Sequence, residues 1–412
     1  LNINIDEKSI LDNHHNKIYL SYNENYYLGI NRALSFTLNT KDELLELINT
    51  CSLKDYKIIS SKSKVVIKFF GGTSFNMDRN SSYPWTKDIP KSIFYIPEIL
   101  IFKKGLNIKA TFTSIIKNDT DITLSIKKYN NFKNQLSFRT PDKTPSIIQN
   151  EILPSKNQYL EIFNKYIDEI NNKKIDKIVL SRMKTLILNN TISKNDLFNN
   201  FDNNCTNFLI DLNQENTFIG STPEQLIELN NNRIYSEAIA GTEKKEAITN
   251  LKNNKKELHE HQFVVNHIAD VLEPYTKSLS IKDEPSIKSL NYIQHLYTPI
   301  YGELNKKTHV IELLYKLYPT SAVLGFPKRY VLNQIKNNEP FDRGWYSGCI
   351  GWFDINGNGR FDVSIRSALI NKNNIHLFSG GGIVKGSNQD KEWDETELKF
   401  QHLISSLSKQ LK

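Results

Sequence analysis

The first third of the chain alternates apolar and polar residues in short runs, separated by turns rich in glycine and asparagine. Alternation with a period of two places successive side chains on opposite faces of a β-strand. The pattern predicts strands in four runs: Lys17–Tyr22, Lys64–Phe70, Ser92–Phe102 and Leu106–Ile116. We therefore expect residues 1–150 to form a strand-rich part of the fold.

A helical period appears after residue 150. Ser155 and Gln158 have the spacing of a capping box, in which each side chain binds the backbone N–H of the other residue. Apolar residues then recur at helical spacing, at Leu160, Phe163, Ile167 and Ile170. The pattern predicts a helix here, and further helices over roughly 243–275 and near 308–317.

Strand patterns also return in the second part of the chain. They cover residues 177–188, 207–212, 216–219, 225–229 and 233–240, and a hairpin joins Cys349–Phe353 to Arg360–Arg366 through the turn 356–359. Strands and helices do not alternate regularly, which favours an α+β fold over a doubly wound one. We expect a single domain, 1–412, of layered and mostly antiparallel sheets flanked by helices, with a variable part at 1–150 and a motif-bearing part at 151–412.

Composition excludes several classes of protein. The 412 residues carry a net charge of +8 and are 39% hydrophobic, and no apolar run reaches the length that spans a bilayer. Lysines are spread along the chain without blocks of like charge, so we expect neither nucleic acid nor a membrane as a partner. The three widely spaced cysteines and the lack of a signal-peptide pattern predict a cytoplasmic protein.

The last forty residues contain the clearest candidate site. Glu392, Glu395 and Lys399 fall on one face of a predicted helix, at spacings of three and four residues. The same face continues into Leu403 and Leu407, so it should turn towards the core. Carboxylates on such a face are costly to bury unless a cation or a proton offsets their charge. We therefore predict a site at this helix.

The start of this helix is also marked in the sequence. We place its N-cap at Ser387, which has the acidic Asp390 three residues on. Three glycines, Gly380–Gly382, precede it, and a turn of this kind could let an anionic group approach backbone amides.

A second acidic helix face lies upstream. Glu260 shares its face with Val264, Ile268 and Val271, which predicts an inward orientation. By itself such a glutamate is usually half solvated, but it has a counterpart in the closing helix. Carboxylates from two helices, without a cluster of cysteine or histidine, suit a hard cation such as Mg²⁺.

Several ordered segments resemble the chorismate-utilising enzymes, and within them the isochorismate synthases most closely. These segments are Lys177–Arg182, Gly220–Glu224, Ala238–Thr242, Glu257–His261, His295–Thr298, Pro319–Thr320, Glu339–Gly348, Ile365–Ser367, Gly380–Val384 and Glu392–Thr396. The resemblance is dense from about residue 155 onwards. In the first part it is weak and rests on Phe70–Phe75 and Phe94–Pro97.

The resemblance implies roles for individual residues. Lys177 would be the general base and Glu224 the general acid, although each residue alone would suggest only a solvated side chain. Mg²⁺ would be held by Glu260 and Glu395, with Glu392 as a further or water-mediated ligand. The substrate chorismate would contact residues from several segments: Ala240, Gly241, Thr242, His295, Thr320, Ala322, Tyr346, Arg366, Gly381, Gly382 and Lys399.

Three positions select a branch of the family. Ammonia-using anthranilate synthases have glutamine where Lys177 stands, aminodeoxychorismate synthases have lysine where Ala240 stands, and salicylate synthases place threonine where Ala322 stands. These positions favour isochorismate as the product, for menaquinone or siderophore biosynthesis. The alternative is a salicylate synthase, which goes on to eliminate pyruvate, and a third possibility is a non-catalytic basic binding protein.

Two departures from the family pattern accompany these expectations. Tyr318 stands where the family usually has histidine, and Gly381 adds a third glycine to the turn. We expect no glutaminase subunit, because a lysine that activates water needs no delivered ammonia. We expect a monomer or a weak homodimer.

Overall fold

The computed structural model describes residues 16–60, 65–78, 81–134, 145–198, 201–245, 251–290 and 292–408. Within these residues every strand pairing is antiparallel, and the strands form one continuous sheet with two long arms. The arms are joined by β4 (Ser92–Lys104), which pairs with β2 (Asn25–Leu38) on one side and with β3 (Lys68–Thr73) and β5 (Asn107–Phe112) on the other.

The first arm leads away from β3. It continues through β16 (Cys349–Asp354), β17 (Gly359–Val363), β10 (Gln225–Asn230), β11 (Arg233–Lys244) and β14 (Ile293–Leu304), and ends at β12 (Thr276–Ile281) and β13 (Ser286–Ser289). The second arm leads away from β2. It continues through β1 (Lys17–Tyr22), β8 (Thr206–Asp211), β9 (Asn216–Thr222), β18 (Ser367–Asn371), β19 (Asn374–Val384) and β7 (Lys177–Leu188), and ends at β6 (Ile147–Leu153) and β15 (Gly325–Phe326).

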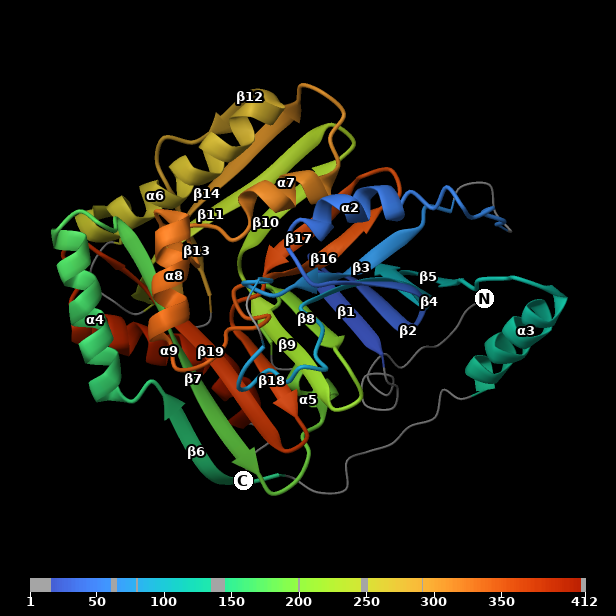
Figure 1. Ribbon diagram of the computed structural model, residues 1–412, viewed down its shortest axis with the longest axis horizontal. Helices are drawn as coiled ribbons and strands as arrows, with labels where there is room; N and C mark the ends of the chain where they lie inside the picture. The colour runs from blue at the N-terminus through green and yellow to red at the C-terminus, as the bar shows by residue number, and fades with distance from the viewer. Residues whose placement is uncertain are drawn as a thin grey trace.

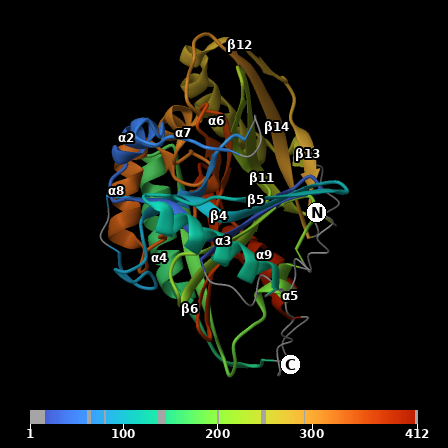
Figure 2. The same ribbon diagram turned by 90° about the vertical axis from the view of Figure 1, so that its right-hand side faces the viewer.

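Helices cover both arms of the sheet (Figure 1). The first arm packs against α6 (Lys255–Leu272), α7 (Val310–Leu317) and, through α7, α2 (Glu43–Thr50). The second arm packs against α4 (Lys156–Asn171), α8 (Lys328–Asn338) and α9 (Gln389–Ser408), with the short α5 (Lys194–Phe198) beside α9. Figure 2 shows α2, α7 and α8 together on one side of the strands, and Figure 1 shows α3 (Asp119–Asn134) apart from the other helices.

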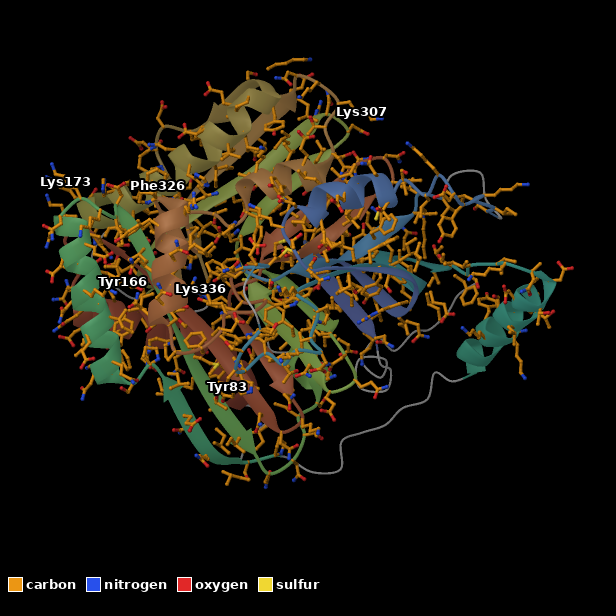
Figure 3. The ribbon with its side chains drawn as sticks, in the orientation of Figure 1. Tyr83, Tyr166, Lys173, Lys307, Phe326 and Lys336 are labelled. Carbon is orange, nitrogen blue, oxygen red and sulfur yellow. The ribbon has the colours of Figure 1, made fainter. Side chains whose placement is uncertain are left out.

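The apolar faces of these elements form the core. Val264 and Ile268 of α6 pack with Leu314 of α7 and Phe353 of β16, and these side chains are at most 1% exposed. Side chains also fill the space between α4 and α8, where Tyr166 is labelled in Figure 3. Its hydroxyl donates to the backbone oxygen of Gln334, at 3.3 Å.

The predicted layered α+β fold is confirmed, and so are most of its elements. The capping box of α4 forms in both directions, between Ser155 and Gln158. The hairpin of β16 and β17 pairs as predicted, although β17 ends at Val363 rather than at residue 366. Both parts of the chain, before and after residue 150, contribute strands to the same sheet.

The predicted start of the helix over 243–275 is wrong. Strand β11 continues through Glu243 and Lys244, which pair with Gln294 and Ile293 of β14. The helix α6 begins only at Lys255, and its N-cap Asn254 accepts hydrogen bonds from the next turn. Pairing with a distant strand outweighs the local helical pattern here.

The predicted turn at Gly380–Gly382 is also wrong, because the three glycines lie within β19 and pair with residues 179–181 of β7. Other boundaries differ as well. The N-cap of α9 is Asn388, which accepts from the backbone N–H groups of Asp390 and Lys391, whereas Ser387 accepts from Val384 in the turn before the helix. The predicted strand Lys64–Phe70 is described only from residue 65, and β3 begins at Lys68. Several elements were not predicted, namely helices α2, α3, α5 and α8 and strands β2, β6, β12, β13, β14, β15, β18 and β19. In α8 only Val331 and Ile335 are buried, too few to give a clear helical period.

Candidate active site

A cavity lies between the two arms of the sheet and encloses about 640 Å³ of empty space, part of it open to solvent. Most of the predicted site residues line it: Glu224, Ala240, Gly241, Thr242, Glu260, His295, Ala322, Tyr346, Arg366, Gly382, Glu395 and Lys399. Four predicted residues do not reach its wall, namely Lys177, Thr320, Gly381 and Glu392, and all four are buried. The sequence segments therefore converge on one site.

Glu224 lies in the connection between β9 and β10 and is 3% exposed. Its Oε1 atom has no hydrogen-bond partner among the described residues. Burial raises the pKa of Glu224 to about 8, against the opposing effect of Lys177, the strongest charge acting on it. The carboxyl group therefore holds its proton at neutral pH and can donate it.

Arg366 and His295 form a second part of the cavity wall. Arg366 has left-handed backbone geometry, with φ of +50°, in the connection from β17 of the first arm to β18 of the second. Its Nη2 lies 3.0 Å from His295 Nε2, and His295 Nδ1 lies 3.3 Å from the backbone oxygen of Gly241. Burial and the charge of Arg366 lower the pKa of His295 well below its usual range. The neutral ring thus accepts from Arg366 and donates to Gly241.

One guanidinium nitrogen remains available. Nη1 of Arg366 is buried and has no partner within the described part of the chain. A guanidinium with free donors in a cavity is suited to a carboxylate ligand. Lys399 adds a second positive charge to the cavity wall, where its Nζ donates to the oxygen of Gly380 at 2.9 Å and contacts Glu395 at 2.6 Å.

Four glutamates from two helices, Glu257 and Glu260 of α6 and Glu392 and Glu395 of α9, form what we call the acidic cluster. Glu257 was not assigned a role from the sequence. It is 6% exposed and accepts from the backbone N–H of Thr242 at 3.0 Å. A signal was present, because the three-residue spacing of Glu257 and Glu260 repeats that of Glu392 and Glu395.

Lysines contact every member of the acidic cluster. Lys177 Nζ lies 2.9 Å from Glu260 Oε1, and Lys256 Nζ lies 2.7 Å from Glu392 and 3.0 Å from Glu257. Burial would raise the pKa of Glu260, but Lys177 and Lys256 outweigh burial and hold that pKa below its usual value. Glu260 therefore stays ionised, although it is buried.

Glu392 differs from Glu260 within the same cluster. Burial, together with the charge of Glu395, raises the pKa of Glu392 to about 7, and Lys256 opposes the shift. Its Oε2 atom is buried without a hydrogen-bond partner among the described residues. The cluster thus contains more carboxylate oxygen than its lysines satisfy.

The chemistry of the acidic cluster fits a hard cation, because its members offer only carboxylate oxygens and one of these is buried without a partner. The contacts as they stand do not form a closed metal site. Among the described residues, no three acidic, histidine or cysteine side chains converge closely enough to hold an ion. Lysine ammonium groups neutralise the cluster instead.

Gly382 makes room for one of these carboxylates. A Cβ atom at Gly382 would lie 2.2 Å from Glu260 Oε1, far inside contact distance. A Cβ atom at the adjacent Gly381 would meet its nearest neighbour, Thr396, at an ordinary 3.5 Å. A side chain at position 382 would therefore displace the carboxylate of Glu260 from its place against β19.

A buried ion pair supports the wall of the cavity. Glu339 accepts from the backbone N–H of Ser181 at 2.9 Å and pairs with Arg343. Arg343 in turn donates to the backbone oxygens of Val179 and Val323, at 2.7 and 2.8 Å. The segment Glu339–Gly348 stood out in the sequence, and its acidic and basic residues fix β7 to the turn that carries Ala322.

Fold and cavity together define an enzyme: a buried protonated carboxyl, two cations suited to a carboxylate and an acidic cluster meet at one cavity of an antiparallel α+β domain. A family model described as "Chorismate binding enzyme" matches residues 5–408. The chain belongs to this family.

Curated relatives carry more specific names. The chain is 29% identical over 351 residues to "Isochorismate synthase MenF" of Bacillus subtilis (strain 168). The aligned residues cover 82% of this chain and 74% of that protein. The chain is 31% identical over 326 residues to "Isochorismate synthase MenF" of Haemophilus influenzae, which covers 76% of this chain and 74% of that protein. A "Salicylate biosynthesis isochorismate synthase" of Pseudomonas aeruginosa is 39% identical, over 46% of this chain and 42% of its own length.

Solved structures share the fold. The menaquinone-specific isochorismate synthase MenF of Escherichia coli superposes with a TM-score of 0.82 at 23% identity, over 99% of this chain and 92% of that one. Anthranilate synthase component I of Streptococcus pneumoniae superposes with a TM-score of 0.71 at 18% identity, over 95% of this chain and 91% of that one. Enzymes with different printed activities thus share this fold. Within the described part of the chain, no helix is both long and apolar enough to cross a membrane.

Proposed function

We propose that this protein is an isochorismate synthase, which moves the hydroxyl group of chorismate from C4 to C2. The observation that carries the proposal is the presence of two buried titratable groups, Glu224 and Lys177, at one site. Glu224 is a buried carboxyl whose pKa is raised to about 8, and Lys177 is a fully buried amine that acts on it more strongly than any other charge. General acid–base chemistry needs two such groups, with environments that separate their roles.

The reaction requires one proton to be taken and one to be given. Lys177 takes a proton from the water that attacks C2, and Glu224 gives a proton to the hydroxyl that leaves C4 as water. The step ends with a protonated lysine and an ionised glutamate, so a proton returns from one to the other before the next turnover. Lys177 lies behind the cavity wall and can act as a base only as a neutral amine, so its contact with Glu260 at 2.9 Å must open for Nζ to reach the water.

The other cavity residues bind the substrate. Arg366, with its free Nη1, and Lys399 provide the positive charge that a dicarboxylate needs, and His295 holds the guanidinium in place. Ala240, Thr242, Ala322 and Tyr346 shape the cavity around the ring. Thr320 and Gly381 lie behind this wall and support it.

The acidic cluster is the proposed Mg²⁺ site. Glu260 and Glu395 would bind the ion directly, and Glu257 and Glu392 would bind it directly or through water. When bound, Mg²⁺ would supply a positive charge that attracts the ring carboxylate of the substrate. The lysine contacts of Glu260, Glu392 and Glu395 would then be exchanged for contacts with the ion.

Isochorismate as the final product is favoured over salicylate by Ala322, which lines the cavity where salicylate synthases have threonine. The relatives named above are isochorismate synthases by their printed names. The biosynthetic pathway, a cytoplasmic location, the monomer or weak homodimer and the lack of a glutaminase subunit stay predictions.

Product analysis tests the proposal. Purified protein is incubated with chorismate, with and without Mg²⁺, and the products are separated by chromatography. We expect isochorismate, formed only with the metal. Salicylate with pyruvate would support the alternative enzyme, anthranilate formed only with added ammonia would overturn the role of Lys177, and unchanged chorismate would overturn the enzymatic proposal.

A further inference from the structure

One ion pair holds the main chain on both sides of Glu224. Lys288 of β13 donates from Nζ to the backbone oxygen of Pro223 at 2.6 Å and contacts Glu237 Oε2 at 2.9 Å. The same Glu237 oxygen accepts from the backbone N–H of Gln225, at 3.4 Å. Pro223 and Gln225 are the two neighbours of Glu224 in the chain, so the ion pair binds the main chain on both sides of Glu224.

The ion pair is itself fixed by its surroundings. The second oxygen of Glu237, Oε1, accepts from the hydroxyl of Tyr235 at 2.7 Å, and that hydroxyl lies 2.8 Å from the hydroxyl of Tyr297. The ammonium group of Lys288 lies 5.2 Å from the centre of the Tyr297 ring. The side chain of Glu237 is 9% exposed and that of Lys288 is 22% exposed. Such shielding leaves few other positions for either group.

Neither member of the pair lines the cavity. We propose that Glu237 and Lys288 are positioning residues, which fix the connection between β9 and β10 so that the carboxyl group of Glu224 stays aimed into the cavity. The inference rests on the proposed function, because it takes Glu224 as the general acid. It assigns the pair an effect on catalysis through the main chain, without contact with the substrate.

The two members of the pair carry opposite charges, which gives the proposal a distinctive test. The charged groups that act on Glu224 are Lys177 of β7, Glu237 of β11, Lys288 of β13 and Arg366 after β17. Among these, Glu237 raises the pKa of Glu224 and the three cations lower it. A general acid works only with its proton, so activity falls as the pH rises through the pKa of Glu224.

In a plot of kcat against pH, the fall of kcat at high pH is the alkaline limb. Two variants should move this limb in opposite directions. E237Q removes the charge that favours the protonated form, and we expect the limb to move to lower pH by about one unit. K288M removes an opposing cation, and we expect the limb to move to higher pH. K288M also releases the oxygen of Pro223, so its kcat should fall about tenfold or more. The KM for chorismate should change less than about twofold in both variants, because neither residue reaches the cavity.

Two further variants serve as controls. K288R keeps the positive charge and a donor to the oxygen of Pro223. Compared with K288M, it should regain most of the kcat, and its alkaline limb should lie at the wild-type pH. K277M breaks an exposed ion pair, between Lys277 and Glu303 on the neighbouring strands β12 and β14, and should leave both unchanged. Thermal melting of each protein shows whether a loss of kcat reflects unfolding.

The outcomes separate the positioning role from the proposed function. Opposite shifts in E237Q and K288M, a fall of kcat in K288M that K288R restores, and melting temperatures close to wild type support the inference. A K288M variant with the kcat of the wild type overturns it. Limbs that stay in place or move in the same direction overturn it, while wild-type formation of isochorismate would leave the proposed function standing. A wild-type protein that forms no isochorismate overturns both.

Discussion

The active site contains acidic side chains in two contrasting settings. Glu224 stands alone in a buried connection, and burial raises its pKa to about 8. The four members of the acidic cluster are crowded between α6 and α9 and contact three lysines, Lys177, Lys256 and Lys399. An isolated buried carboxyl keeps a proton, whereas grouped carboxylates gather cations.

The comparison shows how one residue type serves two purposes in one enzyme. Between Glu260 and Glu224 a lysine decides the difference, because Lys177 contacts Glu260 directly and holds its pKa low, while it acts on Glu224 only at longer range. Within the cluster, burial and the charge of Glu395 still raise the pKa of Glu392 to about 7. The first setting suits proton donation. The acidic cluster suits the binding of a metal ion. In this structure the three lysines supply the positive charge that the ion would bring.

Removal of either proton-transfer group should have the largest effect. We expect E224A and K177A each to lower kcat by about 10²–10⁴-fold, because each removes one of the two groups that the chemistry needs. The rate of isochorismate formation measures the loss, and chorismate binding in the presence of Mg²⁺ should persist in both variants. Activity near the wild-type level in either one would refute its catalytic role.

Neutral replacements in the acidic cluster should act through the metal. We expect E260Q and E395Q to weaken Mg²⁺ binding at least about tenfold, as measured by titration calorimetry on the purified protein. D394N alters an exposed carboxylate of the same helix, α9, and provides a matched control. E224Q should bind Mg²⁺ as the wild type does. If E224Q lost as much Mg²⁺ affinity as E260Q, Glu224 and the acidic cluster would not have separate roles.

The adjacent glycines of β19 provide a finer comparison. We expect G382A to lower both Mg²⁺ affinity and activity about tenfold, because its methyl group would lie 2.2 Å from Glu260 Oε1 and push the carboxylate away. G381A meets only an ordinary contact, at 3.5 Å, and should behave like the wild type. Steady-state kinetics and Mg²⁺ titration of the two variants together check this. Equal effects of both substitutions would mean that the position of Glu260 does not depend on Gly382.

The sequence predicted the inward faces of the two acidic helices because helical spacing depends only on local geometry. Glu260 and Glu395 indeed line the cavity. The resemblance to a known family then located Glu224, which no local pattern distinguishes from a solvated glutamate. The bounds of α6 could not be read in this way, since strand pairing of Glu243 and Lys244 with β14 decides where the helix starts.

Long-range contacts were out of reach of any local pattern. The contact of Lys177 with Glu260 joins residues that only the packing of α6 against β19 and β7 brings together, across the space left by Gly382. The pair of Glu237 and Lys288 depends on the four-residue strand β13, whose sequence has no clear alternation. Glu257 had no predicted role, although its three-residue spacing from Glu260 repeats that of Glu392 and Glu395.

A direct titration of Glu224 tests the central claim, that this carboxyl is protonated at neutral pH while Glu260 is ionised. Protein labelled with ¹³C at the glutamate carboxyl carbon can be followed by NMR as the pH rises from 5 to 9, for the wild type and for E224Q. The account predicts a carboxyl signal that titrates near pH 8 in the wild type and is absent from E224Q. A Glu224 signal that titrates near its ordinary value, between about 4 and 5, would contradict the account.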